Sequence, residues 1–351
     1  MKVLIFGVNG FIGSHLVHRI LSQTDWEVYG MDLGSDRLED LIKEPRFRFL
    51  EGDISINKEW IEYHIKKSDV CLPLVAIATP ASYIKNPLSV FELDFEQNLR
   101  IVRQCAQYGT RVIFPSTSEV YGMCQDKAFN EETSLLTYGP ISKQRWIYAC
   151  AKQMMDRVIW AMGQQKNLQF TLIRPFNWIG SGLDSLTTPK EGSSRVVTQF
   201  LGHLLRKEPI NLVDGGKQRR CFTYVDDGID CLMEIIKNKD GCCDSQIFNI
   251  GNPNNDYSIR ELAELMIDVL REFPTLKHLA DAAELREIPS ADYYGKDYQD
   301  VSYRVPDISR AKKILGWEPK IDLREALRRT ISAYEKELDA ITDFLGSPDQ
   351  I

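Results

Sequence analysis

Short apolar runs that alternate with amphipathic segments organise the first half of the chain. Runs of strand character lie at residues 3–6, 28–31, 47–51, 70–75, 111–114 and 170–174. Between residues 91 and 108 the apolar positions Leu99, Val102 and Cys105 fall on one helical stripe. Strands that alternate with helices at this spacing predict an α/β fold with a doubly wound parallel sheet of the Rossmann type, covered by helices on both faces.

After residue 175 the loops lengthen, and glycine and proline become more frequent. Strand character returns at residues 210–213 and 247–250, and Ser258 with Glu261 forms a capping box that opens a helix through Leu270. The polar, aromatic stretch 281–304 predicts a loop, and residues 309–315 and 323–338 predict closing helices. We expect a Rossmann domain over residues 1–175, which the two later strands rejoin or flank, a smaller α/β substrate-binding domain over 176–345, and a tail over 346–351.

A glycine turn follows the first predicted strand. Gly7, Gly10 and Gly13 open the next helix, and the second strand ends at Asp32. Glycines at this spacing let backbone amides approach a pyrophosphate at a helix N-terminus, and the acid accepts the ribose hydroxyls. Asp32 would repel a 2′-phosphate, so the pattern favours NAD over NADP. Asp53 and Ile54 fall where an adenine would lie, with a plain helix cap as the alternative for Asp53, and the small Ala76 follows the fourth strand.

Composition narrows the class of protein. The chain of 351 residues has a net charge of −7 and a hydrophobic content of 43%, which argues against a nucleic-acid or anionic-membrane surface. Its eight cysteines show no CxxC pair, so we expect reduced thiols, a cytoplasmic location and no metal. The apolar start is interrupted by Gly7 after a few residues, so neither an export signal nor a membrane span is expected.

Two segments carry the candidate chemistry. The strand at 111–114 leads into Thr117, Ser118 and Glu119, at the end of a strand where open α/β sheets bind ligands. Tyr148 and Lys152 share one helical face, where the ammonium would lower the pKa of the phenol toward neutrality. Such a tyrosine is a general base for a sugar hydroxyl. There are two alternatives without catalysis: the pair Tyr148 and Lys152 lies on a helix surface by chance, and Glu119 is a buried structural carboxylate.

These motifs, with the runs Arg174-Pro-Phe-Asn177, Gln218-x-Arg220-x-Phe222, Gly251-Asn-Pro253 and Leu315-Gly-Trp-x-Pro319, resemble an extended short-chain dehydrogenase/reductase that modifies nucleotide sugars. Among these enzymes the chain is most similar to the UDP-glucuronate decarboxylase (dehydrogenase) module of the bifunctional polymyxin-resistance enzymes of the aminoarabinose pathway. Because Met1 begins the dehydrogenase itself, we expect no formyl transfer.

The resemblance implies NAD-dependent oxidative decarboxylation of UDP-glucuronate to UDP-4-keto-pentose, with or without re-reduction to UDP-xylose, by a homodimer formed through residues 91–108 and 148–162. It implies that the catalytic residues are Tyr148, Lys152, Glu119, Thr117, Ser118 and Arg304. It implies that NAD contacts Gly7, Asn9, Gly10, Phe11, Ile12, Gly13, Asp32, Asp53, Ile54, Ala76, Tyr148 and Lys152. It implies that the UDP-sugar contacts Ala78, Tyr83, Thr117, Ser118, Arg145, Asn177, Arg195, Asn211, Arg220 and Tyr298. For Arg304 the alternative is a surface salt bridge.

Other activities of the same scaffold stay open. A 4,6-dehydratase usually has Asp before Glu in the strand that here reads Ser118-Glu119, and a 4-epimerase usually lacks a carboxylate at position 119. UDP-apiose/UDP-xylose synthases share the run 148–153 but have cysteines at the positions of Ala78 and Ser118. A non-catalytic, cofactor-binding regulatory protein would be expected to have lost the pair Tyr148 and Lys152.

Overall fold

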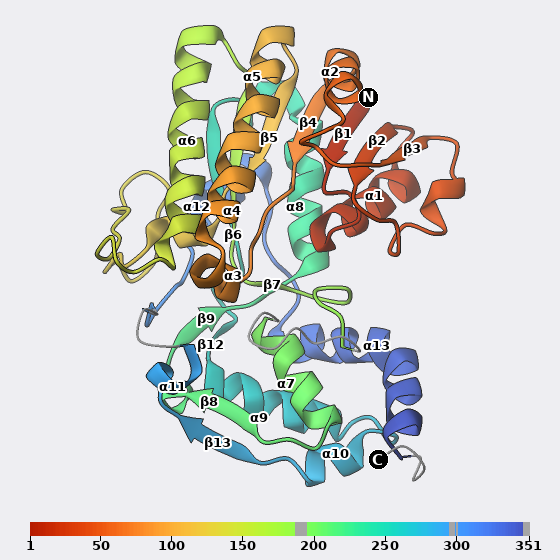
Figure 1. Cartoon of the computed structure of the whole chain (residues 1–351), viewed down its shortest axis with the longest axis vertical. Helices are drawn as coiled ribbons and strands as arrows, with labels where there is room; N and C mark the ends of the chain where they lie inside the picture. Colours follow the sequence, from red (N-terminus) through yellow and green to blue (C-terminus); the bar gives the residue numbers. More distant parts are fainter. Residues whose placement is uncertain (187–194, 295–298, 300, 347–351) are drawn as a thin grey trace.

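A seven-stranded parallel sheet forms the centre of the computed structural model, which describes residues 1–186, 195–294, 299 and 301–346 (Figure 1). Its strand order is β11-β6-β5-β4-β1-β2-β3. The strands are β1 (Lys2–Phe6), β2 (Glu27–Asp32), β3 (Phe47–Glu51), β4 (Val70–Pro73), β5 (Arg111–Pro115), β6 (Phe170–Pro175) and β11 (Gln246–Ile250). The order reverses between β1 and β4, which creates the crevice at the carboxyl ends where such sheets bind ligands.

Helices cover both faces of this sheet, as the alternating apolar pattern requires. Val3 and Ile5 face a core with helices α1 (Phe11–Gln23) and α8 (Val225–Lys237). Leu4 and Phe6 face the opposite core, which α2 (Lys58–Lys67), α5 (Asn98–Tyr108) and α6 (Trp146–Lys166) complete. Successive side chains of a strand point to opposite faces, so one apolar run serves two cores. The predicted fold class is therefore confirmed.

The segment at 91–108 is not one uniform helix. Short helices α3 (Pro80–Lys85) and α4 (Pro87–Phe91) precede a π-helical turn, η2 (Glu92–Gln97), and only then does α5 begin. The π turn contains Asp94, and Asn98 follows it; both side chains are fully buried. A polar pair at core positions is unusual for a helix that only packs.

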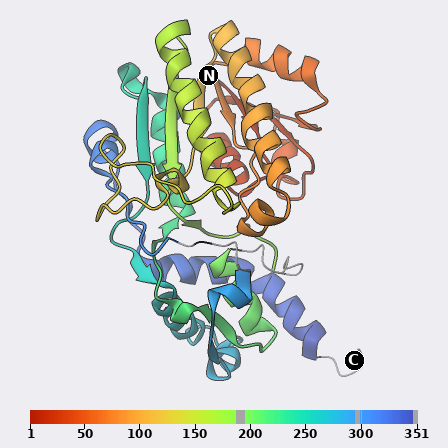
Figure 2. The same cartoon turned by 60° about the vertical axis from the view of Figure 1, so that its left-hand side comes forward.

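A second group of elements lies beyond the carboxyl ends of the sheet strands (Figures 1 and 2). Three two-stranded sheets occur there: β7 (Trp178–Ile179) with β10 (Thr223–Tyr224), β9 (Arg219–Cys221) with β12 (Asp256–Ser258), and β8 (Ile210–Val213) with β13 (Leu285–Ile288). The helices there are α7 (Val196–Leu205), α9 (Ile259–Leu270), α10 (Lys277–Asp281), α11 (Ser290–Tyr294) and α13 (Leu323–Gly346). Helix α12 (Ser309–Leu315) lies apart from them and packs beside β11 of the main sheet (Figure 1). Single 3-10 turns lie at η1 (Leu41–Lys43), η3 (Ser118–Tyr121), η4 (Asp214–Gly216) and η5 (Lys239–Gly241).

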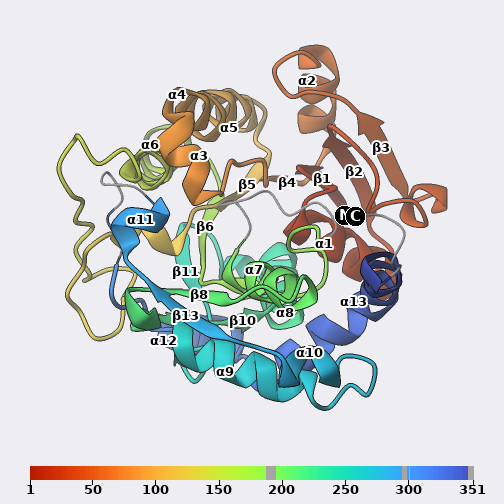
Figure 3. The ribbon, with the colours of Figure 1, turned by 60° about the horizontal axis from the view of Figure 1, so that its bottom comes forward.

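The second half differs from the sequence-based expectation in three places. Strand β8 does not join the main sheet, because it pairs in parallel with β13 (Figure 3). The expected loop at 281–304 contains β13 and α11, and α13 continues past residue 338. The capping box is confirmed, since the Ser258 side chain accepts the Glu261 N–H and the Glu261 carboxylate accepts the Ser258 N–H. Among the described residues, no helix combines the length and apolar character that a membrane crossing needs.

Candidate active site

Two adjoining cavities open between the sheet and the second group of elements. The larger cavity, about 640 Å³, runs along the carboxyl ends of β1, β4 and β5, and the smaller cavity, about 260 Å³, lies toward α7, β8 and β9. Side chains that line both include Ala78, Glu119, Asn177, Arg195 and Arg304. The two cavities are therefore neighbours that share one wall.

The glycine turn forms one end of the larger cavity, together with Phe11 and Ile12. Gly7 has φ +80°, and a Cβ added to Gly13 would lie 2.4 Å from the Gly7 carbonyl oxygen. Both positions therefore require glycine, the first for its backbone conformation and the second for close contact between turn and helix. The turn leaves bare backbone at the N-terminus of α1, which is the arrangement that a pyrophosphate needs.

Asp32 ends β2 beside this turn. Its carboxylate accepts the Asn9 N–H at 2.8 Å and the Leu33 N–H at 2.7 Å, and burial raises its pKa. Asn9 in turn donates its side-chain amide to Asp36 at 2.6 Å. The glycine turn, the acid at the end of β2 and the cavity between them fit the phosphate and ribose groups of a dinucleotide, although neither Asn9 nor Asp32 lines the cavity itself.

Asp53 and Ile54 also lie outside the cavity lining, whereas Ala76 lies within it. The Asp53 carboxylate accepts the Ser55 N–H at 2.7 Å, and this backbone hydrogen bond lowers its pKa. Ile54 packs against the core beneath α2 and α5. The described contacts of Asp53 are thus those of a local turn cap, the alternative noted from the sequence, and contact with an adenine stays a prediction.

Tyr148, at the start of α6, faces the larger cavity and stacks on Tyr83 with ring centroids 4.9 Å apart. The expected lowering of its pKa is wrong: burial raises the pKa of Tyr148, and the charges of Asp94 and Glu119 raise it further. A hydrogen bond with Thr117 acts in the opposite direction. Thr117 and Ser118 follow β5 and line the same cavity, so the expected hydroxyl groups do gather beside the phenol.

Lys152 lies one helical turn after Tyr148 and is 1% exposed. Its ammonium is 3.3 Å from a carboxylate oxygen of Asp94, a fully buried side chain. Asp94 was not among the predicted site residues. It is one of several acidic and amide residues between Glu92 and Asn98, and nothing in this stretch reveals its partner on α6.

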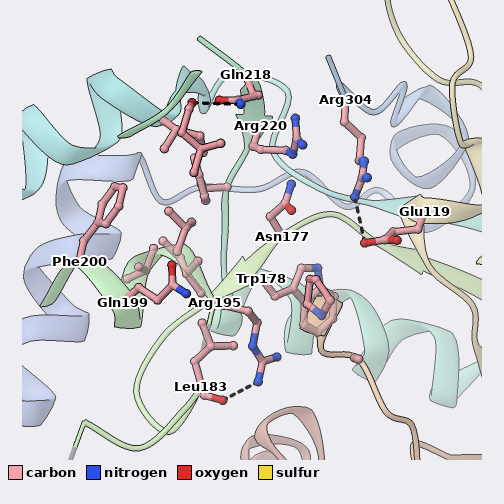
Figure 4. A pocket seen from close by; sticks show the side chains of 18 of the residues that line it. Glu119, Asn177, Trp178, Leu183, Arg195, Gln199, Phe200, Gln218, Arg220 and Arg304 are labelled. Atoms are coloured by element: carbon pink, nitrogen blue, oxygen red, sulfur yellow. Dashed lines mark hydrogen bonds and ion pairs between the residues drawn. The ribbon is translucent and has the colours of Figure 1, made fainter. Parts of the chain in front are cut away.

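Glu119 stands between two arginines that come from distant parts of the chain. Its carboxylate lies 3.3 Å from an Arg145 guanidinium nitrogen. It also lies 3.8 Å from a guanidinium nitrogen of Arg304, and Figure 4 marks this second ion pair. Arg145 precedes α6, and both arginines are buried, so the surface salt bridge considered for Arg304 is excluded. Glu119 therefore holds two buried guanidiniums close to the wall that the cavities share.

The smaller cavity gathers most of the residues expected to bind the nucleotide sugar: Asn177, Arg195, Asn211 and Arg220. The Arg195 guanidinium pairs with Asp184 at 2.8 Å, and that of Arg220 donates to the Val301 carbonyl at 2.7 Å. Ala78 and Arg145 also line this cavity. Tyr298 lies outside the described residues, so its predicted contact stays a prediction.

Several lining residues were not among the predicted site residues. In the larger cavity these are Arg37 and Ser116, and in the smaller cavity Gln199, Phe200, Gln218 and Tyr293. Arg37 follows Asp32 by five residues and donates its backbone N–H to the Asn9 side chain at 2.9 Å. The residues of α7 and α11 carry no motif, because their position depends on how distant segments pack over the sheet.

Comparison with known proteins agrees with this geometry. The profile described as "NAD dependent epimerase/dehydratase family" matches residues 3–251. The crystal structure of PbgP3 protein from Burkholderia pseudomallei is 59% identical, with a TM-score of 0.88 over 97% of this chain and 98% of that one. UDP-glucose 4-epimerase from Thermotoga maritima, solved with UDP-glucose, is 25% identical, with a TM-score of 0.79 over 96% and 100%.

A UDP-glucuronic acid 4-epimerase from Bacillus cereus, solved with UDP-glucuronic acid and NAD, shares the fold at 22% identity and a TM-score of 0.74, over 98% of this chain and 100% of that one. Family membership rests on the profile match and on the 59% identical relative. The glycine turn and Asp32 fit the dinucleotide that the family uses. This chain belongs to the NAD dependent epimerase/dehydratase family, the nucleotide-sugar-modifying group of extended short-chain dehydrogenases/reductases, and its cofactor is NAD.

Proposed function

We propose that the chain catalyses the NAD-dependent oxidative decarboxylation of UDP-glucuronate to UDP-4-keto-pentose. The observation that carries the proposal is the pair of buried guanidiniums, Arg145 and Arg304, on either side of Glu119 at the wall between the cavities. Guanidiniums at this place suit a sugar that carries a carboxylate, because their planar fork of N–H donors matches the two oxygens of a carboxylate.

The residues around Tyr148 suit removal of the sugar 4-hydroxyl proton. Bound NAD supplies the oxidant that accepts the C4 hydride. In the proposed reaction Tyr148 takes the hydroxyl proton, with Thr117 and Ser118 as hydrogen-bond partners of the sugar and Lys152 behind the phenol. Glu119 acts as an acid/base group beside Tyr148.

Loss of CO₂ follows from the chemistry of the oxidised sugar. The 4-ketone is β to the C5 carboxylate, so the C5–C6 bond breaks with its electron pair passing to an enolate, and a proton then adds to C5. The reaction needs the C5–C6 bond held perpendicular to the carbonyl plane, which is a positioning task. We assign this orientation, and delivery of the proton to C5 directly or through water, to Arg304. Firm binding of the carboxylate in its ground state would slow the step.

Binding of the nucleotide is assigned to the smaller cavity. A diphosphate favours guanidinium donors, and Arg195 and Arg220 both line this cavity. Arg195 now pairs with Asp184, an acid that lines the larger cavity. The side-chain amides of Asn177 and Asn211 supply further polar groups on the same walls.

The test is turnover by the purified chain with NAD and UDP-glucuronate labelled at the carboxyl carbon. We expect release of labelled CO₂, and NMR of the product separates the free 4-ketone, formed with NADH, from UDP-xylose, formed by return of the hydride. Retained label with inversion at C4 would instead identify a 4-epimerase. Absence of both products with this substrate would overturn the proposal.

The remaining expectations about organisation are also proposals. We assign NAD binding to residues 1–175 with β11, and sugar-nucleotide binding to most of 176–345. A homodimer through α5 and α6 is supported by the exposed apolar side chains Met154 and Trp160 on α6, and sedimentation of the purified chain tests it. A cytoplasmic location is supported by the eight free cysteines.

A further inference from the structure

The carboxylate of Asp94 connects the active-site lysine to the wall of the NAD cavity. One carboxylate oxygen lies 3.3 Å from the Lys152 ammonium, and the other accepts the Ile77 N–H at 2.9 Å. Ile77 stands between Ala76 and Ala78, which both line the larger cavity. Asp94 itself has no exposed surface, so its contacts with the cavity wall run through these two neighbours.

An irregular helix delivers this carboxylate. Asp94 lies in the π-helical turn η2, and such turns inside helices occur frequently at functional sites. Asn98 follows one turn later, is also fully buried, and donates its amide to the Val75 carbonyl at 3.2 Å. Both polar side chains of this segment therefore hold residues 75–77, the connection that follows β4.

The buried pair has an energetic cost that packing alone does not explain. Well-packed apolar residues in place of a buried ion pair are often neutral or stabilising. A second carboxylate on the same helix, that of Asp156, has other partners: it accepts the Ser116 hydroxyl at 2.8 Å and pairs with Arg174 at 3.3 Å. Asp94 is thus the carboxylate in direct contact with the ammonium of Lys152.

We propose that Asp94 is a positioning residue of the NAD site that acts through Lys152, neutralising the buried ammonium so that the cavity favours the oxidised nicotinamide. The oxidised ring carries a positive charge and the reduced ring does not. An ammonium without its counter-charge would repel only the oxidised form, in a site whose low dielectric strengthens the effect. The inference rests on the cofactor of the family and is independent of the proposed sugar substrate.

The experiment measures binding of NAD and of NADH to the whole chain without sugar, by calorimetry. In Asp94→Asn we expect the ratio of the NAD to the NADH dissociation constant to rise by roughly tenfold, the size of a change of one charge at effective protein dielectric. Asp94→Glu retains the charge, and its ratio is expected to stay at the wild-type value even if both affinities fall.

The matched control is Glu131→Gln. Glu131 is buried, accepts the Asn249 N–H at 2.8 Å and lines neither cavity. Its replacement removes a buried carboxylate of similar burial without touching Lys152, so the ratio is expected to be unchanged. Equal weakening of NAD and NADH binding in folded Asp94→Asn would show a merely structural role and overturn the proposal.

A second variant removes the positive charge of the pair instead of the negative one. Lys152→Met leaves Asp94 unneutralised, so the ratio of dissociation constants is expected to fall below the wild-type value. The double variant Asp94→Asn/Lys152→Met lacks both charges, and its ratio is expected to return toward wild type. If Asp94→Asn does not fold, an unmoved ratio in Lys152→Met alone is sufficient to reject the proposal.

Discussion

The two cavities share a wall but are built in different ways. The larger cavity takes most of its residues from the ends of β1, β4 and β5 and from the starts of the helices α1 and α6. The smaller cavity takes most of its residues from scattered points between Trp178 and Arg304. The larger one therefore depends on the sheet, whereas the smaller one can change with the packing of loops and short helices. This difference lets one family retain its cofactor and vary its sugar.

The largest expected effect lies at the Tyr148 phenol, which lines the larger cavity. Replacement Tyr148→Phe removes the general base, so the turnover number is expected to fall about a thousandfold. The ring still stacks on Tyr83, so NAD affinity is expected to change little. Steady-state kinetics and calorimetry measure the two quantities. A comparable loss of NAD binding would show that the phenol serves the larger cavity alone.

Arg304→Ala tests the wall from the sugar side. We expect release of CO₂ to fall about a hundredfold, the effect of a misplaced reacting group, with NAD affinity unchanged. Arg304→Lys keeps the charge but loses the planar fork of donors, so we expect it to restore only part of the rate. Single-turnover measurement of NADH and labelled CO₂ in one experiment separates oxidation from decarboxylation. Equal losses in both steps would contradict a role specific to decarboxylation.

Gly13→Ala perturbs the larger cavity alone. The added Cβ would meet the Gly7 carbonyl oxygen at 2.4 Å, so α1 must shift away from the turn. We expect the dissociation constant for NAD to rise about tenfold, within the usual cost of about 1–3 kcal/mol for such a clash. Binding of UDP to the smaller cavity, measured by calorimetry, is expected to remain at the wild-type level. A loss in both would mean that the cavities are not separable.

The pH dependence of oxidation reports on the charges around Tyr148. Burial and the charges of Asp94 and Glu119 raise the pKa of Tyr148, so less phenolate is present at a given pH and the rate rises with pH through that pKa. Glu119→Gln removes one raising charge and lowers the pKa of Tyr148. The acidic limb of the single-turnover profile is then expected to move to lower pH. Movement in the opposite direction would exclude electrostatic contact between the two groups.

The smallest effect is expected from a substitution that lies outside both cavities. Ser258→Ala removes the capping box of α9, which is expected to lower the free energy of unfolding by about 1 kcal/mol. NAD affinity and the rate of oxidation are expected to stay unchanged. Denaturant unfolding measures the first, and kinetics measure the others. A changed NAD affinity would couple the second group of elements to the larger cavity.

Local patterns in the sequence predicted the sheet, the glycine turn and the gathering of Thr117, Ser118 and Tyr148, because each lies at the end of a regular element. They did not predict the partner of β8, which comes from a stretch without periodicity. Asp94 was missed because its meaning depends on Lys152, a contact between two helices. The predicted shift of the Tyr148 pKa was wrong in direction. The sequence shows the ammonium of Lys152 four residues away, but it does not show the burial of the phenol or the charges of Asp94 and Glu119 beside it.

The edge strand β11 has a consequence for how the polypeptide matures. It pairs with β6 along five residues, yet the chain between them builds α7, β8, β9 and α8. During synthesis the edge of β6 that pairs with β11 therefore stays without its partner strand until this long insertion has left the ribosome. Exposed strand edges recruit other strands, and long-range pairing is slow. We therefore expect a chain that is interrupted before residue 246 to expose this strand edge, to aggregate readily and to bind chaperones.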